Sequence, residues 1–233
     1  SYNMLDRVIN KTSYLGTPVA ADIAEGDLPA GNMPGGGVEL PDGDFPFPFQ
    51  TSDEGRAMLQ IIHEVAPGAK LAFRTGFVSE SDMAEGIRRL KEINCNIIVD
   101  DITHATAPFY REGLISKAIK EVTSQGVLYF TSAGNFASKS YEGKFSPSAI
   151  PDGGVIPLTG GQPLQKLFLK GRGVSDYMLI LQWDDDFYSA GEVDGADYDL
   201  DVYLTDYTGK NILGYNRVNT GSDPLEIFPF RVS

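Results

Sequence analysis

Residues 51–75, TSDEGRAMLQIIHEVAPGAKLAFRT, carry the pattern that decides the fold. A polar lead precedes apolar residues at helical spacing, a turn at Pro67 and Gly68 follows, and the stretch ends in a short apolar run. This order of amphipathic helix, tight turn and buried strand is typical of an α/β protein. The helix opens with two adjacent acids, Asp53 and Glu54, and their role is the first functional question that the sequence raises.

The alternation of helix and strand patterns continues beyond this stretch. Residues 79–93 and 109–126 have apolar side chains at helical spacing, and each segment is followed by a short apolar run. The first run, CNIIVDD at 95–101, predicts a strand buried on both faces, and the second is VLYFTSAGN at 127–135. We therefore expect right-handed crossovers and a parallel sheet with helices on both faces.

The pattern divides the chain into two parts. Residues 1–145 form the expected α/β part, of which residues 1–50 are rich in glycine and proline and predict a long loop excursion. From residue 146 the helical period is lost, and five short alternating runs are separated by Gly, Asp, Asn and Pro. These runs predict an antiparallel β-sandwich over residues 146–233, either appended to the α/β part or inserted in it.

The composition argues against several classes of function. The chain has 233 residues and a formal charge of -13 at pH 7, and nucleic acids and anionic membranes carry the same sign of charge, so we expect neither as a partner. No apolar run approaches the roughly 18 residues of a membrane span. A single cysteine, Cys95, leaves no internal disulfide and no cysteine-rich metal site. No GxGxxG or GxxxxGK[ST] loop follows a strand, which argues against a nucleotide cofactor.

Two of the motifs resemble those of subtilases. EGRAMLQIIHEVAPGAKL at 54–71 is similar to the subtilase helix that ordinarily reads HGTxVAGII followed by VAPxAxL, and VLYFTSAGN is similar to the strand that ends in an AAGN or SAGN turn. The resemblance covers roughly residues 51–140. YDLDVYLTDYTGK at 198–210 also resembles the bacterial pre-peptidase C-terminal type of β-sandwich, which accompanies secreted proteases. The resemblance implies a secreted, periplasmic or cell-surface serine endopeptidase that acts on polypeptides and requires no cofactor.

The resemblance assigns a role to Asn135 in the SAGN turn. Subtilases place here the asparagine whose side-chain amide donates to the oxyanion, a preorganised donor for charge that develops in the transition state. The structural alternative is a turn asparagine that follows Gly134.

Glu54 falls on the position of the catalytic histidine of subtilases. A carboxylate base would resemble the Ser-Glu-Asp triad of the related sedolisins, although the aspartate that sedolisins carry four residues later is Met58 here. The alternative is a capping box, because Thr51 and Glu54 have the T-x-x-E spacing of a helix start. Asp53 is either a substitute or partner for Glu54 as the base, or a carboxylate that interacts with the helix dipole.

The sequence lacks a nucleophile motif. A subtilase needs a GTSxA-like turn into a buried helix, and neither this segment nor a GxSxG elbow occurs in the chain. We therefore expect a fragment that is inactive alone, with the serine and the first catalytic aspartate in missing segments of its own protease domain. A noncatalytic peptide- or glycan-binding module derived from a protease is the alternative.

Two further sets of acids are candidate binding residues. Asp100 and Asp101 end the strand that lines the substrate cleft in subtilases, where they would bind a basic side chain or cap the next loop, and His104 follows in that loop. In the second part, three aspartates alternate, so that a strand would place them on one face, where a calcium ion would relieve their repulsion. The alternative is a solvated acidic edge. These aspartates are Asp197, Asp199 and Asp201.

Overall fold

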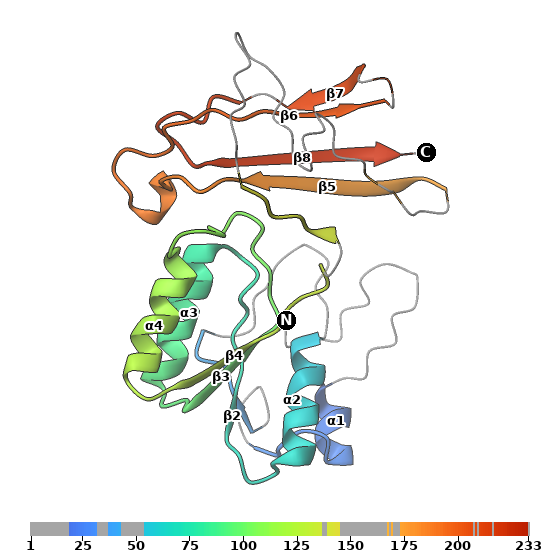
Figure 1. Ribbon diagram of the computed structural model, residues 1–233. Coiled ribbons are helices and arrows are strands. Elements are labelled where there is room, and N and C mark those ends of the chain that lie inside the picture. The colour runs from blue at the N-terminus through green and yellow to red at the C-terminus, as the bar shows by residue number, and fades with distance from the viewer. Residues whose placement is uncertain are drawn as a thin grey trace. The chain divides into compact units, whose positions relative to one another are not determined.

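The chain is mixed α/β: helices alternate with short parallel strand pairs in the N-terminal part, and a mostly antiparallel β region follows (Figure 1). Contacts divide it into two units, the first made of Ser1–Ala107 with Glu112–Ser132 and the second of Pro108–Arg111 with Ala133–Ser233. The computed structural model describes residues 19–31, 37–42, 54–136, 139–144, 167, 169, 173–206, 208, 210–215 and 217–232.

The first unit begins with two helices and a short parallel strand pair. Helices α1 (Val19–Glu25) and α2 (Glu54–Val65) accompany β1 (Val38–Glu39), which pairs with β2 (Leu71–Ala72). These elements share a small apolar core of Val19, Leu28, Val38, Leu59 and Leu71. Residues 1–50 were expected to form a long loop excursion, and this was wrong for α1 and β1, because elements of seven and two residues are too short to show a period.

A buried ion pair joins the two helices of this core. The Nε atom of Arg56 on α2 lies 3.4 Å from an Oδ2 atom of Asp22 on α1, and the two side chains are 5% and 3% exposed. Removal of one partner of a buried ion pair is strongly destabilising, so this pair helps to fix α1 to α2.

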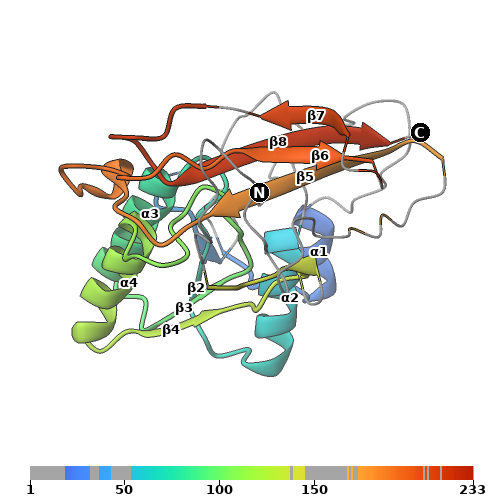
Figure 2. The same ribbon diagram turned by 45° about the horizontal axis from the view of Figure 1, so that its top comes forward.

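The rest of the first unit is a parallel crossover. It contains α3 (Glu80–Glu92), β3 (Ile97–Asp100), α4 (Leu114–Ser124) and β4 (Leu128–Thr131), and β3 pairs with β4 in register from Ile97 with Leu128 to Asp100 with Thr131. The two helices lie side by side in both views (Figures 1 and 2). Their core with the strands consists of Met83, Ala84, Ile87, Ile98, Ala118, Val122 and Val127.

The ends of these helices follow the chemistry of helix caps. Ser79 is the N-cap of α3, and its hydroxyl accepts a hydrogen bond from the backbone N–H of Asp82. After α3 the chain turns at Asn94, which has a left-handed φ of 68°, and after α4 it turns at Gly126, with φ of 88°.

The β3–β4 pair is covered on one face, which corrects the expectation of helices on both faces. Ile98 points into the core with α3 and α4, whereas the residues that alternate with it are exposed, Ile97 to 58% and Phe130 on β4 to 55%. Both crossover helices pack on the same side, and an apolar run alone does not state how many faces of its strand are covered.

The second unit contains two antiparallel strand pairs. The long strands β5 (Ser175–Gln182) and β8 (Leu225–Val232) pair along their length, and β6 (Val202–Thr205) forms a hairpin with β7 (Asn211–Tyr215). The first of the five predicted runs, at 164–171, lies outside the described residues except for two positions. Figure 2 shows the hairpin beside β8.

The inward row of β8 decides where the core of this unit lies. Glu226, Phe228 and Phe230 alternate along the strand and all are buried. The ring of Phe230 stacks on Tyr177 of β5 with a centroid separation of 5.5 Å. A glutamate therefore occupies the same row as two core aromatic residues.

A short strap from the first part of the chain belongs to the second unit. The backbone N–H of Phe109 donates to Oε1 of Gln182, the last residue of β5, at 2.9 Å. Arg111 forms an ion pair with Asp184 at 2.6 Å and lies 3.9 Å from a carboxylate oxygen of Asp186. The polypeptide thus enters the second unit, returns to the first unit and leaves it again after Ser132.

Candidate functional site

The carboxyl ends of β3 and β4 meet at one sheet edge, where Asp100 holds both strands. Its Oδ2 atom accepts a hydrogen bond from the Tyr129 hydroxyl at 2.5 Å, and its Oδ1 atom accepts from the Thr131 hydroxyl at 2.9 Å and from the backbone N–H of Ile102 at 3.3 Å. Burial, with a further contribution from Asp100, raises the pKa of Tyr129, so its hydroxyl stays protonated and donates. These contacts tie the strand ends together and cap the following loop.

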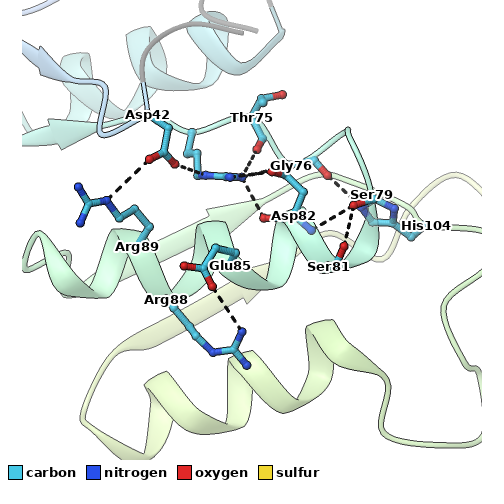
Figure 3. A network of polar contacts seen from close by, with 11 residues as sticks. Asp42, Thr75, Gly76, Ser79, Ser81, Asp82, Glu85, Arg88, Arg89 and His104 are labelled. Carbon is cyan, nitrogen blue, oxygen red and sulfur yellow. Dashed lines mark hydrogen bonds and ion pairs between the residues drawn. The ribbon is translucent and has the colours of Figure 1, made fainter. Parts of the chain in front are cut away.

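The loop after β3 carries Asp101 and His104. Asp101 is exposed, and His104 is half-buried with Nε2 2.9 Å from the carbonyl oxygen of Gly76 (Figure 3). A carbonyl oxygen only accepts, so Nε2 of His104 carries a proton in this contact. Thr106 donates to a carboxylate oxygen of Glu80 at 2.5 Å, which gives the loop a second attachment to the start of α3.

An arginine that the sequence patterns did not single out fixes the segment on which this loop rests. Arg74 donates from Nη1 and Nη2 to the two carboxylate oxygens of Asp82 at 3.0 and 2.8 Å, and from Nε to Asp42 at 2.5 Å. The hydrogen bond with Asp82 is the largest cause that raises the pKa of Arg74. A bidentate contact of this kind positions a backbone more strictly than a single bond does.

The same arginine lies against Gly86 of α3. A Cβ atom at Gly86 would come within 2.6 Å of Nη1 of Arg74, so the glycine makes room for the guanidinium. Figure 3 shows Asp42, Asp82 and the neighbouring Arg89 around this point. Arg74 connects its own segment with those of Asp42 and Asp82, which are distant in sequence. No local sequence motif predicts such a network.

Glu54 is the first residue of α2 and is exposed. The helix start packs closely on the residue after β2, because a Cβ atom at Gly55 would lie 2.3 Å from the Phe73 ring. Thr51 and Asp53 lie outside the described residues, and the expectations for a capping box and for Asp53 as a base fall there.

Asn135 follows β4 in the SAGN turn. Gly134 before it has a left-handed φ of 70°, and Asn135 is exposed. Glu54 belongs to the first unit and Asn135 to the second. At the edge of the β3–β4 pair the structure places Asp100 at the end of β3 and Asp101 and His104 in the loop that follows.

The acidic strip, residues 197–201 of the second unit, does not form the expected strand. Asp197, Asp199 and Asp201 precede β6 in irregular backbone, which corrects the expectation of alternating residues on one strand face. The cause is Asp185, whose Oδ2 atom accepts from the backbone N–H of Asp197 at 2.9 Å and that of Tyr198 at 3.1 Å. Among the described residues, no three His, Cys, Asp or Glu side chains are grouped at metal-binding spacing.

Comparison with known proteins found no relative of this chain. No family model, no curated protein and no solved structure matches the chain. Within the described ranges, none of the helices has both the length and the apolar character needed to cross a bilayer.

Proposed function

We propose that the chain is part of a subtilisin-like serine endopeptidase whose nucleophilic serine lies in a segment outside residues 1–233. The observation that supports this most is the β3–α4–β4 parallel crossover that ends in the SAGN turn, preceded by the α2 helix that begins at Glu54. In parallel sheets, functional groups gather at the carboxyl ends of the strands and in the loops that follow.

In this proposal each group has one role in acyl transfer. The serine hydroxyl attacks the scissile carbonyl carbon and its proton passes to Glu54, with Asp53 as the partner or substitute of that base. The Asn135 amide donates to the oxyanion that forms, and Glu54 then returns the proton to the leaving amine. Water hydrolyses the acyl-enzyme by the same route.

The loop after β3 supplies a wall for the polypeptide substrate. Asp100 positions the strand ends, whereas the carboxylate of Asp101 is exposed and suited to a basic substrate side chain. His104 lies in the same loop, where its Nε2 atom contacts the carbonyl oxygen of Gly76. A secreted or cell-surface location belongs to the same proposal and is supported by the sequence resemblance alone.

The decisive experiment compares this chain with a polypeptide that also contains a GTSxA segment. We expect no turnover of fluorogenic casein by residues 1–233 and turnover by the longer protein. In the longer protein, Glu54→Gln would reduce kcat by orders of magnitude, because an amide cannot accept the serine proton. Glu64→Gln is the matched control, since Glu64 is an exposed glutamate of the same helix.

The pH profile separates the base from a helix cap. A carboxylate base keeps activity below about pH 6.5, where a histidine base becomes protonated. Near-full turnover in Glu54→Gln with a profile that still falls near this pH would refute the role of Glu54. A parent gene without a GTSxA segment would favour the noncatalytic binding module.

A further inference from the structure

The β3–β4 pair has an open apolar surface on the side away from α3 and α4. The strand register places Ile97 beside Leu128 and Val99 beside Phe130. The exposed fractions of these four side chains, here called the outward face, lie between 45% and 58%. A contiguous exposed apolar patch marks an interaction site more often than a single exposed side chain does.

The opposite row of the same strands shows why these side chains are open. Ile98 is buried in the core with α3 and α4, and Asp100 in its row accepts a hydrogen bond from the Tyr129 hydroxyl. Successive side chains of a strand point to opposite faces, so Ile97 and Val99 cannot reach this core. Parallel strands are almost always covered on both faces, and the outward face is therefore the place for a further layer.

The dimensions of the outward face fit one α-helix. The strands have four residues each, and strands of this length extend about 13 Å at roughly 3.3 Å per residue. Within the described part of the chain they form a sheet of two strands, and neighbouring strands lie about 4.8 Å apart. A helix about 10 Å wide covers both strands, and about nine of its residues match their length.

The charges around the outward face select the kind of helix. Asp101 lies two residues after Val99, is exposed, and forms no ion pair with any cation in the described ranges. The chain has a formal charge of -13, so a second copy or an anionic lipid surface would be repelled and a basic segment attracted. The N-terminus of a helix is its positive end and is stabilised by a carboxylate. A helix antiparallel to the strands would place this end at Asp101.

We propose that the outward face binds one amphipathic helix of a partner protein. The helix runs antiparallel to β3 and β4, lays its apolar stripe on the outward face and places a Lys or Arg of its first turn beside Asp101. This binding goes beyond the proposed protease activity and is measured without turnover. A helix docked here would compete for Asp101 with a basic substrate side chain.

The test measures the binding of synthetic helices to the full chain by fluorescence anisotropy. Three labelled peptides of about 12 residues are each held helical by the same side-chain lactam, with leucines at i, i+3, i+4 and i+7. The first peptide has lysines in its first turn, the second has the same lysines in its last turn, and the third has glutamates in place of the lysines. We expect the first peptide to bind about three- to fivefold more tightly than the second, and the third not to bind.

Substitutions on the outward face separate this site from general attraction to an acidic protein. Phe130→Ser should weaken the first peptide about tenfold, and Val99→Thr, which keeps the shape of the side chain, about threefold. Met178→Ser is the apolar control, because Met178 on β5 is 60% exposed and lies in the second unit. Asp101→Asn should remove the preference for the first peptide over the second, whereas Glu85→Gln, at an exposed glutamate of α3, should keep it. Circular dichroism confirms that each variant is folded.

Four results would overturn the proposal. Failure of the first peptide to bind, or equal binding by the wild type, Phe130→Ser and Val99→Thr, would exclude the outward face as its site. An unchanged preference in Asp101→Asn would exclude the proposed direction of the helix. A dimer in sedimentation velocity that Phe130→Ser abolishes would assign the face to a second copy. Binding to phosphatidylcholine vesicles that the same variant abolishes would assign it to lipid.

Discussion

The burial of the Glu226 carboxyl predicts how the free energy of unfolding depends on pH. Burial raises the pKa of the Glu226 carboxyl from its ordinary value of 4.5 to about 7 in the folded chain. Because the folded pKa is raised, the folded state binds more protons between these two values. The contribution to stability is therefore fully present below pH 4.5, decreases as the pH rises, and is lost above pH 7.

The size of this loss follows from the same two values. A rise in pKa from 4.5 to about 7 corresponds to about 3 kcal/mol, at about 1.4 kcal/mol for each unit of pKa. Residual solvent screening reduces this figure, so we expect about 2 to 3 kcal/mol. Glu226→Gln has no titrating group and should show no such loss.

The assay is urea unfolding followed by Trp183 fluorescence at pH values from 4 to 8, in wild type and in Glu226→Gln. The difference between their free energies of unfolding isolates Glu226, because other carboxylates titrate equally in both proteins. We expect this difference to shift by about 2 to 3 kcal/mol against the wild type as the pH rises from 4.5 to 7. A difference that stays constant over this range would refute the burial argument.

Three other substitutions test the rest of the structure. Asp22→Ala should lower the free energy of unfolding by about 3 to 5 kcal/mol, because it breaks a buried ion pair and removes the carboxylate that lies 3.4 Å from Nε of Arg56; a loss below about 1 kcal/mol in urea unfolding would contradict this. Gly86→Ala should destabilise by about 1 to 2 kcal/mol, since displacing Arg74 outweighs a gain of about 1 kcal/mol in helix propensity, and an increase in Tm would show the contact to be unimportant. In an active longer protein, Asn135→Ala should reduce kcat by about 10²- to 10³-fold with little change in KM, and unchanged turnover would exclude the oxyanion role.

The sequence could predict those elements whose cause is local. The helix at 80–92 was predictable because its apolar spacing and its Ser79 cap both point to the same start. The β3–α4–β4 crossover was predictable because two apolar runs flank one amphipathic helix. Helix α1 and strand β1 were not predictable, since their stability comes from the shared core around Leu59.

The candidate sites depend more on contacts between distant segments. Asp100 and His104 were identified from their place after a strand, but the network of Arg74 connects residues whose spacing carries no signal. Glu226 could have been found, because the alternation in LEIFPFRV places it on the same face as two phenylalanines. The backbone contacts that Asp185 makes with the acidic strip could not be inferred from the alternation of its aspartates.

The strap at residues 108–111 has a consequence for how the gene can be divided. A cut after Ser132 would free a segment that has lost Phe109 as a donor to Gln182 and Arg111 as the counter-ion of Asp184. The C-terminal segment would keep Asp184 and Asp186 but lose Arg111, which forms ion pairs with them. Recombination after Ser132 would therefore separate residues that belong to one unit. Each unit is built from two separate segments of the sequence. A single recombination event in the gene therefore could not transfer either unit intact to another protein.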